Sequence, residues 1–160
     1  MTWRGSIDTK DRIFAALPYL LPLISALEFG VFLIRQFPFF GIILIPLLPI
    51  VKLMSAIPFA SFIIFLALYM GVVRNERISH FIRFNTLQAI LIDILLFLIS
   101  LVFGFIAAPL AGSLPLIVET LANVIFLGAL AACGYSMVQS FLGRYAEIPA
   151  FSEAVRAQVP

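Results

Sequence analysis

The residues in this sequence best suited to chemistry are polar side chains that interrupt its longest apolar runs. They are Asn85, Gln88 and Asp93 in one run, Glu28 in another, and Glu119 with Asn123 in a third. An aspartate deep in a bilayer costs roughly 2.5 to 3.5 kcal/mol on insertion scales. Such side chains must therefore face a partner inside a helix bundle or a water-filled path.

Two interpretations of these residues stay open. In the structural one, Asp93 is buried between helices, hydrogen-bonded or protonated, and Asn85 and Gln88 bond across helices. In the functional one, the same groups line a polar pathway. Asp93 shares one helical face with Thr86, Phe97, Ser100 and Gly104. For two of the acids a third interpretation is simple solvation at a membrane surface. Glu119 lies near a span end and Glu28 precedes Arg35 by seven residues, so both can reach water.

No known catalytic pattern accompanies these residues. The sequence has no Ser-His-Asp set, no zinc-protease motif, no P-loop and no glycine-rich dinucleotide loop. A metal site would need ligands beyond the only histidine, His80, and the single cysteine, Cys133, excludes a disulfide within the chain. We therefore expect no enzyme activity, no metal and no cofactor, with His80 solvated at a membrane surface and Cys133 packed among small residues.

The composition is that of an integral membrane protein. The 160 residues are 63% hydrophobic and 11% charged, with a mean hydropathy of +1.16, whereas soluble domains have about 25% charged residues. The net charge of +2 gives no reason to expect a nucleic-acid partner. Several apolar runs reach the roughly 20 residues that cross a bilayer as a helix. The sequence thus predicts an all-α, polytopic membrane protein.

The apolar runs divide the chain into one transmembrane domain, 12–142, between a polar N-tail, 1–11, and a polar C-tail, 143–160. Four spans are predicted, at about 12–34, 56–73, 81–105 and 116–142. Pro18 and Pro22 should kink the first. Prolines also interrupt the segment 37–52, which is short for a span and is predicted to be re-entrant or interfacial. In the C-tail, Phe151, Val155 and Val159 share an apolar face, which suggests a short surface helix.

The basic residues predict an orientation. Eight of the ten Lys and Arg residues fall in the two tails and in the hinge before the third span: Arg4, Lys10, Arg12, Arg74, Arg77, Arg83, Arg144 and Arg156. The opposite side has Arg35 and Lys52. Basic loops stay in the cytoplasm, so both termini should be cytoplasmic, or stromal in a plastid. The hinge residues Arg74, Arg77 and Arg83 are topology signals or lipid contacts, or a docking patch for a soluble partner.

The stretch HFIRFNTLQAILIDI, from His80 to Ile94, and the earlier PYLLPL, from Pro18 to Leu23, resemble one known family. It is the family of the twenty-kilodalton subunit of the translocon at the chloroplast inner envelope, with its cyanobacterial homologues. The likeness runs from about residue 12 to residue 142. It implies four membrane helices, termini on the stromal or cytoplasmic side, and a role in moving proteins across or into a membrane. No transit peptide is recognisable, so a cyanobacterial homologue or a mature form is expected.

The resemblance implies a subunit of a protein translocation complex that contributes a polar helix bundle to a protein-conducting path. The alternative is a non-channel scaffold or assembly factor that packs against a larger complex through small residues such as Gly128 and Gly134. The expected partners are the lipid bilayer, other membrane subunits or further copies of the chain, and a transiting polypeptide. The expected membrane is the plasma or thylakoid membrane of a cyanobacterium-like cell, or the plastid inner envelope.

Overall fold

The computed structural model describes residues 6–160, and every regular element in that range is helical. The first five residues, which include Arg4 and part of the predicted N-tail, lie outside the described range. Four helical stretches are long and apolar enough to cross a membrane: Thr9–Gln36, Pro38–Ala56, His80–Leu110 and Pro115–Phe141. The predicted fold class, an all-α polytopic membrane protein, is confirmed.

The first stretch alternates between α-helical and 3-10 segments. It runs through α1 (Thr9–Ala16), the 3-10 turn η1 (Leu17–Tyr19), α2 (Leu20–Ala26), the 3-10 turn η2 (Leu27–Gly30) and α3 (Val31–Gln36). Pro18 lies in η1 and Pro22 in α2. A proline lacks the N–H that an α-helix needs and its ring crowds the preceding turn, so the helix tightens locally to 3-10 geometry. Asp8 begins the run by accepting a hydrogen bond from the Thr9 N–H at 2.7 Å.

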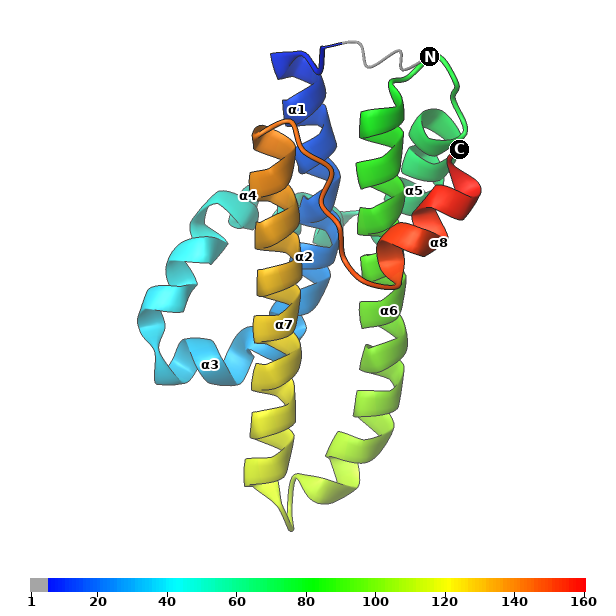
Figure 1. Cartoon of the computed structure of the whole chain (residues 1–160). Coiled ribbons are helices and arrows are strands. Elements are labelled where there is room, and N and C mark those ends of the chain that lie inside the picture. Colours follow the sequence, from blue (N-terminus) through cyan, green and yellow to red (C-terminus); the bar gives the residue numbers. More distant parts are fainter. Residues whose placement is uncertain (1–5) are drawn as a thin grey trace.

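The core lies where this first stretch packs against two long helices, α6 (His80–Leu110) and α7 (Pro115–Phe141) (Figure 1). At about 1.5 Å per residue, α6 is about 46 Å long and exceeds the roughly 30 Å hydrocarbon core of a bilayer. The packed side chains include Phe29, Leu96 and Phe126, all at most 5% exposed. Gly30 lets η2 approach α7 closely, because a Cβ there would lie 2.8 Å from the Phe126 ring.

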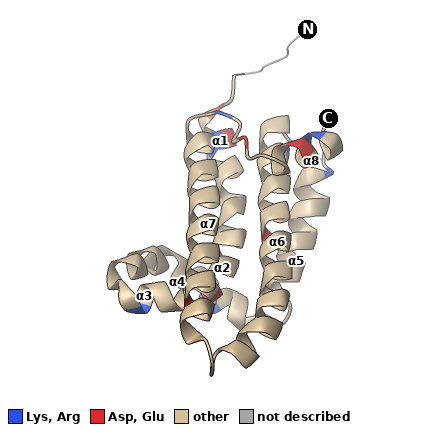
Figure 2. Ribbon diagram, turned by 60° about the horizontal axis from the view of Figure 1, so that its bottom comes forward, with Lys and Arg blue, Asp and Glu red and all other residues tan. Residues whose placement is uncertain are grey.

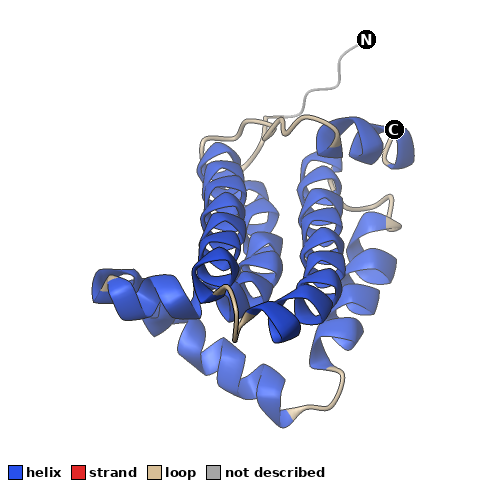
Figure 3. Cartoon of the chain, turned by 90° about the horizontal axis from the view of Figure 1, so that it is seen from below, coloured by secondary structure: helices blue, strands red, loops and turns tan. Residues whose placement is uncertain are grey.

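Residues 31–56 form an arm at the side of this bundle. The arm comprises α3, the 3-10 segment η3 (Pro38–Ile43) and α4 (Leu44–Ala56), and it projects laterally when the bundle is seen from below (Figure 3). Leu47 is the one buried residue that the described helices η3 and α4 contribute. The rest of the arm is largely available to lipid or to another protein.

Two neighbouring segments are candidates for the second span. The segment Pro38–Ala56 reaches spanning length, whereas Ala60–Val73 is shorter and consists of α5 (Ala60–Leu68) and the π-helical turn η4 (Tyr69–Val73). Yet α5 and η4 run beside α6 (Figure 1), while the other segment lies in the arm. The division into spans at 12–34, 56–73, 81–105 and 116–142, with 37–52 re-entrant or interfacial, therefore stays a prediction.

The two ends of the described chain lie at the same end of the bundle, together with the hinge between η4 and α6 (Figure 1). Most of the charged residues that the structure describes lie at this end of the ribbon (Figure 2). The C-tail forms α8 (Phe151–Gln158), as its apolar face suggests, and buries Val155 and Val159 at 0% and 1% exposure. These two side chains pack with Val73, Phe84 and neighbouring residues of η4 and α6.

Candidate functional site

Asn85 and Gln88 meet Tyr19 in a buried hydrogen-bond network at the end of the bundle that holds the termini. All three residues are 0% exposed. The Tyr19 hydroxyl donates to Asn85 Oδ1 at 2.9 Å and accepts from Gln88 Nε2 at 3.1 Å. Asn85 also donates to the Phe81 carbonyl at 2.9 Å, and Ser140 of α7 donates to Asn85 Oδ1 at 3.1 Å. The network thus joins the first helical stretch, α6 and α7.

The C-tail completes the network from outside the three helices. Gln88 Nε2 donates to the Ala146 carbonyl at 3.0 Å, and the Ser152 hydroxyl donates to Gln88 Oε1 at 3.0 Å. Ser152 Oγ also accepts from the Ile148 N–H at 2.7 Å. The amide of Gln88 therefore ties the start of α8 to the interior of the bundle.

His80 holds the far end of the same tail. One of its ring nitrogens, Nδ1, lies 2.9 Å from the Tyr145 hydroxyl, and the other, Nε2, lies 2.9 Å from the Val159 carbonyl. The carbonyl can only accept, so Nε2 carries the proton in this arrangement. Arg156 and Glu147 form an ion pair at the surface. His80 is exposed, as predicted, but it also fastens the end of α8 to the start of α6.

Asp93 lies on α6 about two turns beyond Asn85 and outside the buried network. It is partly buried, and Ser25 of α2 donates to Asp93 Oδ1 at 2.5 Å. Both residues, with Glu28 of η2, line a hollow of about 630 Å³ that α2, η2, α5 and α6 form at the side of the bundle. We call this hollow the Asp93 groove. Its remaining lining is mostly aromatic or aliphatic, and includes Phe62 and Phe97.

Glu119 and Asn123 stand apart from both groups. They lie one turn apart near the start of α7, and neither lines the Asp93 groove. Glu119 is exposed, while Asn123 is partly buried and its Oδ1 has no hydrogen-bond partner among the described residues. The six predicted site residues thus separate into three groups: a buried network, a lateral groove and a pair near the start of α7.

The basic hinge lies at the surface. Arg74 and Arg77 are exposed, and Arg83 is half-buried. Arg83 Nε donates to the Val73 carbonyl at 2.8 Å, which ties α6 to the end of η4. Arg83 thus has a structural contact, while Arg74 and Arg77 remain available to lipid headgroups or a soluble partner. Within residues 6–160, no three His, Cys, Asp or Glu side chains come together as metal ligands.

Sequence reasoning missed the partners of the predicted residues. Tyr19, Ser25, Ser140 and Ser152 supply the hydrogen bonds, and the Ala146 carbonyl supplies another. Tyr19 had a signal, because it lies between Pro18 and Pro22 in an apolar run. Ser152 and Ala146 had none, since the apolar face of the C-tail predicts a short surface helix but not which polar groups of α6 the tail meets.

Comparison with known proteins identifies the family. Residues 8–155 match the family model described as "Chloroplast import apparatus Tic20-like". A Tic20 family protein of Synechocystis sp. is 53% identical over 99% of both chains. The Arabidopsis thaliana "Protein TIC 20-v, chloroplastic" is 35% identical over 96% of this chain and 73% of its own length. A Tic20 family protein, Ycf60, of the alga Gracilaria tenuistipitata is 38% identical over 97% of this chain and 78% of its own.

These matches confirm the resemblance that the His80–Ile94 stretch indicates. They agree with the four apolar helices that make this chain a membrane protein, and the family names point to a translocon component rather than an enzyme. The chain belongs to the Tic20 family, whose model carries the name of the chloroplast import apparatus.

Proposed function

We propose that this chain is a membrane subunit of a protein translocation complex and that the Asp93 groove forms part of the polypeptide's path. One observation carries the proposal: a partly exposed aspartate, hydrogen-bonded to Ser25, lines a hollow that opens sideways from the helices. Carboxylates at membrane depth are costly, and they commonly mark substrate paths. Glu28 lines the same groove.

The lining of the groove suits an unfolded polypeptide. Such a substrate presents apolar side chains and peptide groups together, and its N–H groups need acceptors away from water. The groove offers aromatic surface at Phe62, Phe65 and Phe97, and acceptors at Asp93 and Glu28. A purely apolar cleft would satisfy the side chains and leave the peptide groups unpaired.

The buried network argues against a path through the centre of this single chain. Asn85, Gln88 and Tyr19 already bond to one another and to the C-tail, and Phe126 is 0% exposed in the core below them. A polypeptide passing there would have to break these bonds. We therefore propose that Asn85 and Gln88 act as a helix interface, and that a partner subunit or a second copy closes the groove.

A non-channel scaffold is the second candidate function. The outward side of α7 favours it, since Gly128 and Gly134 are exposed and a Cβ at either would meet nothing within 4 Å. Small residues let membrane helices approach closely. Reconstitution separates the two candidates, because a path-forming subunit, with its partners, passes a polypeptide across vesicles and a scaffold alone does not.

We also propose that both termini face the cytoplasm or stroma, in a cyanobacterial plasma or thylakoid membrane or a plastid inner envelope. The described ends of the chain share one end of the bundle with the basic hinge (Figure 2), and basic segments stay on the cytoplasmic side. Protease protection of tagged termini tests this orientation, and protection that differs between the two tags would contradict it.

Asp93→Leu is expected to slow transport while leaving the abundance of the protein equal or higher, because the insertion cost of a membrane acid disappears. A hydrogen bond inside a membrane is worth about 0.6 to 1.7 kcal/mol, so the rate should fall by about three- to twentyfold. Asp93→Asn keeps an acceptor for Ser25 and should retain most of the rate. The measurement is transport of a labelled precursor in membranes that contain only the variant.

The matched control is Thr120→Val, an exposed residue of α7 whose hydroxyl bonds to its own helix at Leu116. It should leave transport unchanged. Wild-type transport by Asp93→Leu at equal abundance would remove the support for the groove as part of the path.

A further inference from the structure

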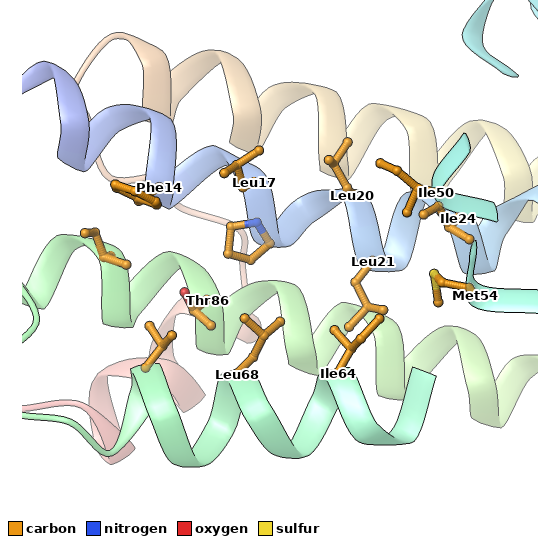
Figure 4. Close-up of a pocket in the computed structure, with 13 residues that line it drawn as sticks. Phe14, Leu17, Leu20, Leu21, Ile24, Ile50, Met54, Ile64, Leu68 and Thr86 are labelled. Carbon is orange, nitrogen blue, oxygen red and sulfur yellow. The ribbon is translucent and has the colours of Figure 1, made fainter. Parts of the chain in front are cut away.

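A second opening lies between the first helical stretch and α5 and shares no residue with the Asp93 groove. It has a volume of about 320 Å³, and its walls come from α1, η1, α2, α4, α5, η4 and α6 (Figure 4). We call it the Thr86 pocket. Of its 13 lining residues, 12 are apolar, and Thr86 is the exception. Nothing in the proposed translocation function uses this pocket.

Thr86 has an unmet hydrogen-bonding capacity. The residue is 0% exposed, and its hydroxyl oxygen has no hydrogen-bond partner among the described residues. A threonine inside a helix commonly bonds to the carbonyl one turn back, but this one does not. Figure 4 shows Thr86 rising from α6 toward the first helical stretch, among the apolar side chains. A ligand that brings an acceptor to this point would satisfy the hydroxyl.

The depth and the surrounding charges indicate where that ligand comes from. Thr86 lies about 9 Å along the axis from the first residue of α6, just below the charged end of the bundle. Two exposed basic residues are close in sequence to lining residues at this end, since Lys10 comes one turn before Phe14, and Arg74 comes two residues after Val72. Basic residues at this level attract anionic lipid headgroups.

The size of the pocket favours an acyl chain over a helix as its occupant. A helix with its side chains is about 10–12 Å across, so even one turn would overfill a space of this volume. A single hydrocarbon chain is narrow and flexible, so it can fill an apolar space of this size by van der Waals contact, which is what drives packing inside a bilayer. The apolar walls therefore match one acyl chain of a bilayer lipid better than a helix from a second copy of this protein.

We propose that the Thr86 pocket binds one acyl chain of an anionic glycerolipid, and that this acyl chain lies between the first helical stretch and α5. The Thr86 hydroxyl donates to the ester carbonyl of that chain, and the headgroup lies among Lys10 and Arg74. The bound lipid fills the space that separates Leu21 of α2 from Ile64 and Leu68 of α5.

The test uses the full chain reconstituted into vesicles that contain phosphatidylglycerol with a diazirine midway along one acyl chain. Illumination followed by peptide mapping should place the adducts on residues 17–24 and 64–72, in excess over residues 121–130 of α7. Leu68→Trp fills the pocket and should lower the pocket adducts by about tenfold, while Thr86→Val removes one hydrogen bond and should lower them by about two- to tenfold.

The matched control is Ile63→Trp, which adds the same ring to α5 outside the pocket. Ile63 is 53% exposed, so this variant should leave the adducts unchanged. Thr86→Val is nearly isosteric, so it keeps the proposal testable if the bulkier variant does not fold. Adducts that neither variant reduces, or that are no denser than on α7, would overturn the proposal. A covalent dimer of the Ile64→Cys variant, formed in place of lipid adducts, would also overturn it.

Discussion

Gln88→Leu is expected to destabilise the bundle by about 2–4 kcal/mol, because it removes the best partner of two buried polar groups, and a buried polar group with no partner costs about 1–3 kcal/mol. The Ser152 hydroxyl and the Ala146 carbonyl both lose their 3.0 Å partner on the Gln88 amide, and between them they keep only a long contact of 3.4 Å. Tyr19 also loses a donor. Average hydrogen bonds in membranes are worth less, about 0.6 kcal/mol. The larger figure applies here because one amide holds three groups that are away from water.

The effect should concentrate in the C-tail. Unfolding in detergent with increasing SDS measures the stability, and hydrogen exchange at residues 144–158 shows whether α8 detaches. Ser152→Ala added to Gln88→Leu should cost less than the sum of the two single changes, since the residues share one bond. An unchanged stability with unchanged exchange in the tail would mean that the network does not hold the chain together.

Gly30→Ala is expected to destabilise the bundle by about 1–3 kcal/mol, the usual cost of overpacking. The added Cβ would lie 2.8 Å from Phe126 Cε2 and 2.9 Å from Cζ. Phe126 is 0% exposed and contributes to the core between η2 and α7, so its ring has little room to retreat. Unfolding in detergent measures the loss.

Gly128→Ala is the matched control for this change. Gly128 is also helical, but nothing lies within 4 Å of its added Cβ, so the variant should be neutral or slightly more stable through helix propensity. Subtracting the control isolates the clash. Phe126→Leu should partly rescue Gly30→Ala, and a purely additive double variant would contradict the close approach of η2 and α7.

The sequence predicted what local patterns determine. The long apolar runs produced helices at His80–Leu110 and Pro115–Phe141, within a few residues of the predicted 81–105 and 116–142 except at the end of α6. There the helix continues through Pro109 to Leu110. Pro18 marked a break in α-helical geometry in the first stretch, the 3-10 turn η1, because the missing N–H acts on its own helix.

Tertiary contacts were beyond the same reasoning. Asn85 and Gln88 were placed as polar groups near one end of a span, but their partners come from Tyr19, 66 and 69 residues away, and from the C-tail. Asp93 and Glu28 line one groove because α6 packs against α2, which runs directly into η2. Apolar character alone also did not distinguish the arm from α5, since both segments are strongly hydrophobic.

The central claim is that a transiting polypeptide touches the Asp93 groove and not the packed interior. Photo-cross-linking tests it most directly, with a photoreactive amino acid placed at one position at a time in the assembled complex. Phe62 and Phe97 are groove positions, 59% and 60% exposed. Val138 of α7, 57% exposed, is the control outside the groove.

With a polypeptide stalled in transit, adducts to it are predicted from Phe62 and Phe97 and not from Val138. Equal adducts from Val138, or adducts from the buried position Ala89 with none from the groove, would contradict the account.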